Sequence, residues 1–141
     1  MHPALSVILL TTLIGVGQGL FLALYTGQAY SVANLLEHQD SQSFYAVGSA
    51  LAVAFLVAGL IASFFHLGHP ERAWRSIARW RTSWLSREVI VLPVVMLLVF
   101  LYGLVHYLEW TQPLFTVAGA LPVHATLIIG ALAPLATVAL F

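Results

Sequence analysis

Four long apolar runs dominate this sequence and constrain its fold more than any other feature. They cover about residues 4–30, 44–67, 87–110 and 115–141, and a helix needs about 20 apolar residues to cross a bilayer. The chain is 61% hydrophobic and 7% charged, whereas soluble domains carry about 25% charged residues. The runs are continuous, unlike the alternating segments of a membrane β-barrel. We therefore expect an all-α integral membrane protein with four transmembrane helices and a single membrane domain over 1–141.

What the sequence lacks also narrows the function. The chain has no cysteine, so any iron–sulfur cluster must belong to a partner. It has no basic tail, and nucleic-acid binding is not expected. Its start, MHPALSVILL, has neither a basic n-region nor a cleavage motif, which indicates a retained helix rather than a signal peptide. It stops on TVALF without a polar flank, which suggests a piece of a longer protein.

The basic residues are concentrated in one segment between the second and third runs. They are Arg72, Arg75, Arg79, Arg81 and Arg87. Because short loops rich in Lys and Arg stay in the cytoplasm, we expect the loop 68–86 and both chain ends on that side. Glu37 and Asp40 then face outward.

Within this basic loop, residues 71–80 have the pattern of a short amphipathic helix. At 100° per residue, the arginines gather on one face and the tryptophans on the other, as in a helix that lies in the membrane interface. One interpretation is an anchor that only fixes the topology. The other is a docking surface for a soluble partner, formed by Arg72, Arg75, Arg79 and Arg81.

Polar residues inside the apolar runs are the candidates for chemistry, because ionisable groups in a membrane are costly. His66 ends the second run, and an imidazole there could exchange protons with a quinone. Gln18 and Glu88 could complete this site. Equally, Gln18 could bond to a neighbouring helix. Glu88 could cap the third helix, whose N-cap we expect at Ser86, or pair with Arg87.

Two further patterns have competing interpretations. His106 and His124 lie toward the opposite side from the basic loop, and a pair of membrane histidines can ligate haem b, so His106 with His124 or His66 is an alternative cofactor site. Gly15, Gly17 and Gly19 are typical of close helix packing in lipid. They have no strand–turn–helix context and so do not indicate a dinucleotide-binding loop.

The segment FHLGHPERAWRSI, followed by SWLSREV, resembles the membrane-anchor subunits of dimethyl sulfoxide reductase-type molybdoenzymes. The family pattern is H-L-G-x-P-x-R-A, a loop of about a dozen residues, and L-S-x-E at the next helix. The matching residues here are His66, Leu67, Gly68, Pro70, Arg72, Ala73, Leu85, Ser86 and Glu88. A GQ pair, Gly17 and Gln18, lies in the first run as in the family.

The resemblance implies an eight-helix, haem-free anchor, of which this chain is the N-terminal half. It implies a bound quinone, ubiquinone or menaquinone, with His66 as the matching histidine and Glu88 as the matching carboxylate. We expect Gln18 and Arg72 to complete the site, and no metal on this chain. It also implies two partners, an iron–sulfur subunit and a molybdopterin catalytic subunit, in a bacterial cytoplasmic (inner) membrane.

Within the family, the N-terminal stretch is most similar to anchors of cytoplasmic sulfite-oxidising molybdoenzymes. The predicted function is therefore electron transfer between an iron–sulfur subunit and the quinone pool during sulfite oxidation, with no catalysis by this chain alone. The alternatives are the anchor of a dimethyl sulfoxide or polysulfide-type reductase that oxidises quinol, and a haem b-bearing anchor.

Overall fold

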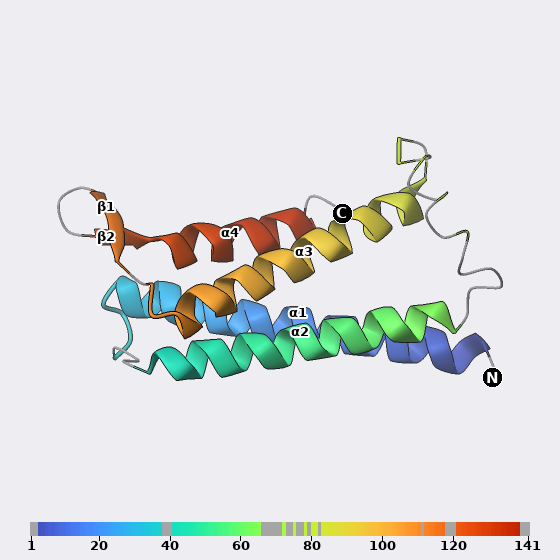
Figure 1. Ribbon diagram of the computed structural model, residues 1–141, viewed down its shortest axis with the longest axis horizontal. Coiled ribbons are helices and arrows are strands. Elements are labelled where there is room, and N and C mark those ends of the chain that lie inside the picture. The colour runs from blue at the N-terminus through green and yellow to red at the C-terminus, as the bar shows by residue number, and fades with distance from the viewer. Residues whose placement is uncertain are drawn as a thin grey trace.

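Over the residues that it describes, the computed structural model is a bundle of four helices with one short β-hairpin (Figure 1). The helices are α1 (Pro3–Val32), α2 (Gln42–Phe64), α3 (Trp84–Tyr107) and α4 (Ala125–Val138). The hairpin pairs β1 (Pro113–Val117) with the antiparallel β2 (Leu121–His124). The described residues are 3–37, 41–65, 72, 75, 78, 80–81, 83–110, 112–117 and 121–138.

Three described helices are long and apolar enough to cross a membrane. They are Leu5–Val32, Gln42–Phe64 and Val89–Tyr107, and they correspond to the first three apolar runs. Large apolar side chains cover much of their outer surface, as expected for helices in contact with lipid. The all-helical membrane character expected from the sequence is thus present in the described residues, apart from the hairpin.

The fourth apolar run does not form one helix over about 115–141 as expected. Strands β1 and β2 take its first part, and α4 begins only at Ala125. Pro122, which we expected to kink that helix, lies in β2. A proline cannot donate a helical hydrogen bond, and the neighbouring β-branched residues favour a strand. Pro134 does lie inside α4. This helix has 14 residues, about 21 Å, whereas the hydrocarbon core is about 30 Å thick.

Helix α3 begins earlier than expected. Ser83, in extended conformation, holds the N-cap position and makes no side-chain capping bond, whereas Ser86 is buried within the first turn. The backbone of Glu88 therefore lies beyond the first turn, where the helix dipole stabilises an anion less. The expected capping roles of Ser86 and Glu88 are not supported.

The closest packing joins α1 and α2, and it depends on glycine. A Cβ at Gly17 would lie 2.8 Å from Leu56 Cγ and 2.9 Å from the Ala52 carbonyl oxygen. A Cβ at Gly59 would lie 2.7 Å from Cγ1 of Ile14, so each helix has a glycine facing the other. α3 packs against α2 and α4. The core between the helices consists of Phe21, Leu24, Tyr45, Ala52, Leu56, Val95, Val99, Tyr102 and Ala133.

The bundle has two distinct ends (Figure 1). We call the end with the hairpin, the start of α2 and the end of α3 the hairpin end. The arginine end carries the start of α1, the end of α2 and the start of α3, with the basic segment between the last two.

Candidate functional site

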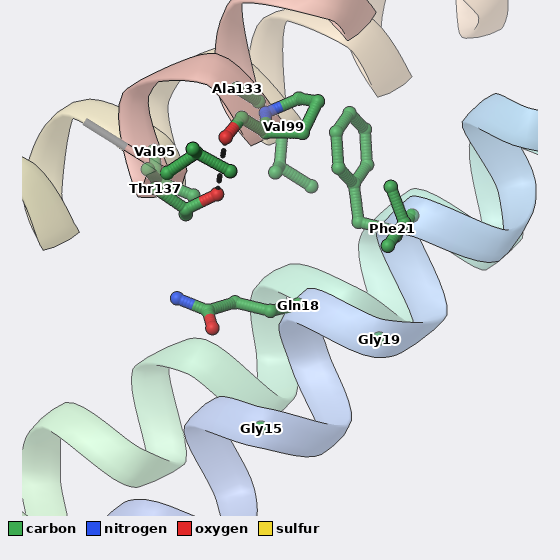
Figure 2. A pocket seen from close by; sticks show the side chains of 11 residues that line it. Gly15, Gln18, Gly19, Phe21, Val95, Val99, Ala133 and Thr137 are labelled. Carbon is green, nitrogen blue, oxygen red and sulfur yellow. Dashed lines mark hydrogen bonds between the residues drawn. The ribbon is translucent and has the colours of Figure 1, made fainter. Parts of the chain in front are cut away.

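A cavity lies between α1, α3 and α4 in the middle of the bundle (Figure 2). Its volume is about 260 Å³ and its walls are largely apolar. It is half open, because α1 and α4 pack together much less than the other neighbouring helices. The lining includes Gly15, Gln18, Gly19, Phe21, Val95, Val99, Ala133 and Thr137.

Gln18 is the polar residue with free hydrogen-bonding capacity in this cavity. Its carboxamide extends from α1 into the space below α4 (Figure 2). It makes no hydrogen bond to any residue that the structure describes. The hydroxyl of Thr137, on the facing wall, donates to the carbonyl of Pro134 at 2.6 Å. An amide without a protein partner inside a bilayer needs a polar partner, and a ligand carbonyl would supply one.

Glycines on α1 make room for the cavity. Gly15 and Gly19 are one turn apart, and a Cβ at either would meet nothing within 4 Å. Gly17, between them, faces α2 instead. The three glycines therefore have two different roles: one closes the α1–α2 contact and two line open space.

Glu88, also predicted for the quinone site, lies toward the arginine end. His66 lies outside the described residues, directly after the segment that ends with Phe65. Glu88 has a described backbone in α3 but no described side chain; it precedes Val95 by seven residues, about 10 Å along a helix. The structure thus places Gln18 deeper in the bundle than the backbone of Glu88, and contacts among the predicted residues fall outside what it describes.

The predicted docking arginines are only partly described. Arg72, Arg75 and Arg81 are exposed, and Arg79 lies outside the described residues. The Arg81 guanidinium lies 5.4 Å from the centre of the Trp80 ring. Because too few of residues 71–80 are described, the amphipathic helix stays a prediction.

Arg87 ties the basic segment to α3. Its Nε donates to the Trp80 carbonyl at 3.2 Å, and Nη2 donates to the Arg81 carbonyl at 3.4 Å. The side chain therefore holds the end of the loop against the helix.

The structure also reveals a buried polar cluster near the hairpin end, which we call the Gln28 network. It comprises Gln28, Gln42, Tyr102, His106 and Thr126, with one or two residues from each of the four helices. Tyr102 donates its hydroxyl to Gln28 Oε1 at 2.8 Å, and Gln28 Nε2 donates to Thr126 Oγ1 at 2.9 Å. His106 Nε2 lies 3.3 Å from Gln28 Nε2, and its Nδ1 lies 2.7 Å from Gln42 Oε1.

Aromatic rings enclose the imidazole of His106, which is 2% exposed. The Tyr45 ring stacks on it at 4.8 Å, and the Tyr102 ring meets it edge-on at 4.7 Å. Both ring nitrogens are hydrogen-bonded within the network.

Of the five members of the network, only His106 was singled out from the sequence; Gln28, Gln42, Tyr102 and Thr126 were missed. Gln28 interrupts the first apolar run just as Gln18 does, and this interruption was the available signal.

Comparison with known proteins places these features in context. The family model described as "DMSO reductase anchor subunit (DmsC)" matches residues 1–139. A sulfite dehydrogenase subunit of Allochromatium vinosum is 66% identical over 141 residues, which are all of this chain and 43% of that protein. This chain therefore spans less than half the length of that relative. No solved structure matches.

Proposed function

The chain belongs to the DMSO reductase anchor subunit family, and on this basis we propose that it is the quinone-reactive part of a molybdoenzyme membrane anchor. In this proposal electrons leave a cytoplasmic molybdopterin subunit, pass through the clusters of an iron–sulfur subunit and reach quinone in the membrane. Sulfite is the favoured substrate of the complex, because the similar protein of Allochromatium vinosum is named a sulfite dehydrogenase subunit.

The cavity beside Gln18 is the observation that carries the quinone assignment. Small-molecule sites are mostly apolar, with a few placed polar groups and volumes of about 300–1,000 Å³. At about 260 Å³ and half open, this cavity suits a planar ring whose apolar tail leaves between α1 and α4. The residues present therefore fit a quinone, which when bound accepts two electrons and two protons.

The protein side chains have separate roles in this proposal. Gln18 orients the ligand by donating an amide N–H to a carbonyl oxygen. His66 and Glu88, toward the arginine end, hold and deliver protons on the side where the iron–sulfur subunit docks. Arg72 adds a positive charge at that end, and it forms the docking surface with Arg75, Arg79 and Arg81.

The topology that we propose follows from the position of the arginines in the chain. α4 completes a set of four spans, the basic loop 68–86 and both ends lie in the cytoplasm, and the membrane is the bacterial inner membrane. The segment 71–80 lies as an amphipathic helix in the interface. Because the relative is more than twice as long, this chain corresponds to the N-terminal half of an eight-helix anchor.

Steady-state kinetics of the purified full complex test the quinone site. We expect His66→Ala to lower the quinone-dependent rate by about 100-fold or more, as for loss of a general acid or base. Gln18→Leu should raise the quinone KM about tenfold, because about 1.4 kcal/mol of hydrogen bonding is lost. Neither should change the reduction of a soluble dye that takes electrons from the catalytic subunits directly.

The control is Thr11→Val, also on α1, where the hydroxyl bonds only to the carbonyls of Val7 and Ile8. It should leave the quinone KM unchanged. Unaltered quinone reduction and inhibitor binding in His66→Ala would remove the quinone-site assignment. A b-type band in the visible spectrum of the purified chain would instead establish the haem-bearing alternative.

A further inference from the structure

The Gln28 network has no role in the proposed quinone chemistry, yet it places an ionisable ring in a membrane-spanning helix. Such residues are costly in lipid and commonly bind ions or protons. His106 is in α3, while its hydrogen-bond partners come from α1 and α2. The donors and acceptors around the ring show which protonation states this site can hold.

In the arrangement observed, the hydrogen bonds of the network match a neutral His106 imidazole. Gln28 Oε1 accepts from the Tyr102 hydroxyl, so Nε2 is the amide atom that faces Thr126 and His106. Since an amide N–H donates, His106 Nε2 must accept and carries no proton. The ring proton is therefore on Nδ1, which donates to Gln42 Oε1 at 2.7 Å.

A half-turn of the Gln28 carboxamide would satisfy the protonated ring equally well. Oε1 would then accept from His106 Nε2–H and from the Thr126 hydroxyl, and Nε2 would donate to the Tyr102 oxygen. Hydroxyl groups both donate and accept, so no hydrogen bond between these groups is lost. The bond from Nδ1–H to Gln42 stays in place in both states.

The Tyr45 ring favours a positive charge on His106, whereas burial and the neighbouring His124 oppose one. The face of the Tyr45 ring, from α2, stacks on His106 with 22° between the planes, as in a cation–π pair. Other titratable groups near the site are Tyr102 on α3, Tyr25 on α1 and His124 on β2. Among the described residues, the groups that contact the imidazole are amides and aromatic rings.

Gln42 gives the site a connection to the protein surface. It is the first residue of α2 and is half-buried, whereas Ser41 and Ser43 beside it are exposed. The network thus extends from the hairpin end of the bundle inward to Tyr102, whose ring packs edge-on against Phe21 in the cavity wall.

We propose that His106 and Gln28 form a reversible proton-binding site inside the bundle, reached from the hairpin end. A proton from water forms the Nε2–H bond of His106, the charge of the site rises by one, and the Gln28 carboxamide turns to accept the new donor. The site lies at the opposite end of the bundle from the arginine end and needs no quinone to operate, so it stands independently of the proposed function.

Solid-state NMR of the full complex in lipid, with ¹⁵N-labelled histidine and glutamine, tests the proposal. The His106 signals are identified by their loss in His106→Asn. On acidification we expect the unprotonated Nε2 signal of His106 to be lost and the Gln28 side-chain nitrogen signal to shift at the same pH. The proposal would be overturned if His106 stayed neutral at every pH at which the complex is intact. It would also be overturned if His106 titrated without a shift of the Gln28 signal.

Gln28→Met is the informative variant, because it cannot accept from the protonated ring. A bond to a charged group is stronger than one to a neutral group, so the midpoint of His106 protonation should fall by about one pH unit, a tenfold weaker proton affinity. Gln18→Leu, on the same helix, should leave the midpoint unchanged. An unchanged midpoint in Gln28→Met also overturns the proposal, and if this variant does not assemble, the wild-type titration decides.

Discussion

Gln18 and Gln28 are the same residue type on the same helix, ten positions apart, and their surroundings differ completely. The amide of Gln28 is buried and bonded to three side chains, from α3 and α4. The amide of Gln18 extends into a half-open cavity and has no partner in the described part of the chain. Ten residues at about 100° each place the two side chains about 80° apart around α1.

The difference shows what a polar residue in a spanning helix can do. Where neighbouring helices supply matching hydrogen-bond donors and acceptors, an amide stabilises the packing of the bundle and leaves no space for a ligand. Where the neighbouring helices lie farther away, the same amide has no protein partner and can hydrogen-bond to a ligand. The position of α4 decides between these outcomes, because its Thr126 closes the Gln28 network while its Ala133 and Thr137 only border the cavity.

The largest effect on stability should come from Gln28→Leu. It leaves the Tyr102 hydroxyl, the Thr126 hydroxyl and His106 Nε2 buried without their partner, and we expect a loss of about 2–4 kcal/mol in the free energy of unfolding. Unfolding of the full-length protein by SDS, followed by circular dichroism, measures it. Gln18→Leu is the matched control and should change the same quantity by less than about 0.5 kcal/mol. Equal losses of stability in the two variants would contradict the different roles of the two glutamines.

Gly17→Ala should have the second-largest effect. Its new methyl group would overlap the Ala52 carbonyl oxygen and Leu56, so α1 and α2 must separate, at a cost of about 1–3 kcal/mol. Thermal unfolding of the full-length protein would show the loss as a lower Tm. A wild-type Tm would mean that the two helices do not touch at Gly17.

Tyr102→Phe should have a smaller effect than either, because it removes one donor from the Gln28 network and leaves the ring packing intact. Gln28 Oε1 loses the hydrogen bond of 2.8 Å, and we expect about 1 kcal/mol of destabilisation in the SDS titration. A loss as large as that of Gln28→Leu would mean that the hydroxyl, rather than the amide, holds the network together.

Gly19→Ala should have almost no effect on stability. A Cβ there meets nothing within 4 Å, and alanine favours a helix more than glycine does. We expect a change between zero and about 1 kcal/mol of stabilisation, measured beside Gly17→Ala. A clear destabilisation would show that the cavity side of α1 is closed by other parts of the full-length protein.

The sequence predicted the features that depend on local pattern. Continuous apolar runs were enough to place α1, α2 and α3, because spanning a bilayer requires length and hydrophobicity. The hairpin was missed because PLFTVAGALPVH is as apolar as a membrane helix, although its β-branched residues favour a strand and Pro122 disfavours a helix interior.

The site was predictable only in part, for a different reason. Gln18 was identified because it interrupts an apolar run and belongs to a family pattern, and the structure places it in a cavity. Gln28 interrupts the same run, but its partners lie 74, 78 and 98 residues further along the chain. Helix propensity and hydrophobic periodicity do not predict contacts of that range. Only the packing of α3 and α4 on α1 distinguishes the two amides.

The placement of the aromatic residues has a practical consequence. The four tryptophans are Trp74, Trp80, Trp84 and Trp110. Trp110 follows α3 at the hairpin end, 70% exposed, and the other three lie in or beside the basic segment. The fluorescence of Trp80 and Trp110, whose side chains the structure describes as exposed, therefore originates near the two ends of the bundle, where indole rings favour the headgroup region of a membrane. Lipids brominated at graded depths would quench it in proportion to immersion, so the unlabelled protein reports how it sits in a bilayer.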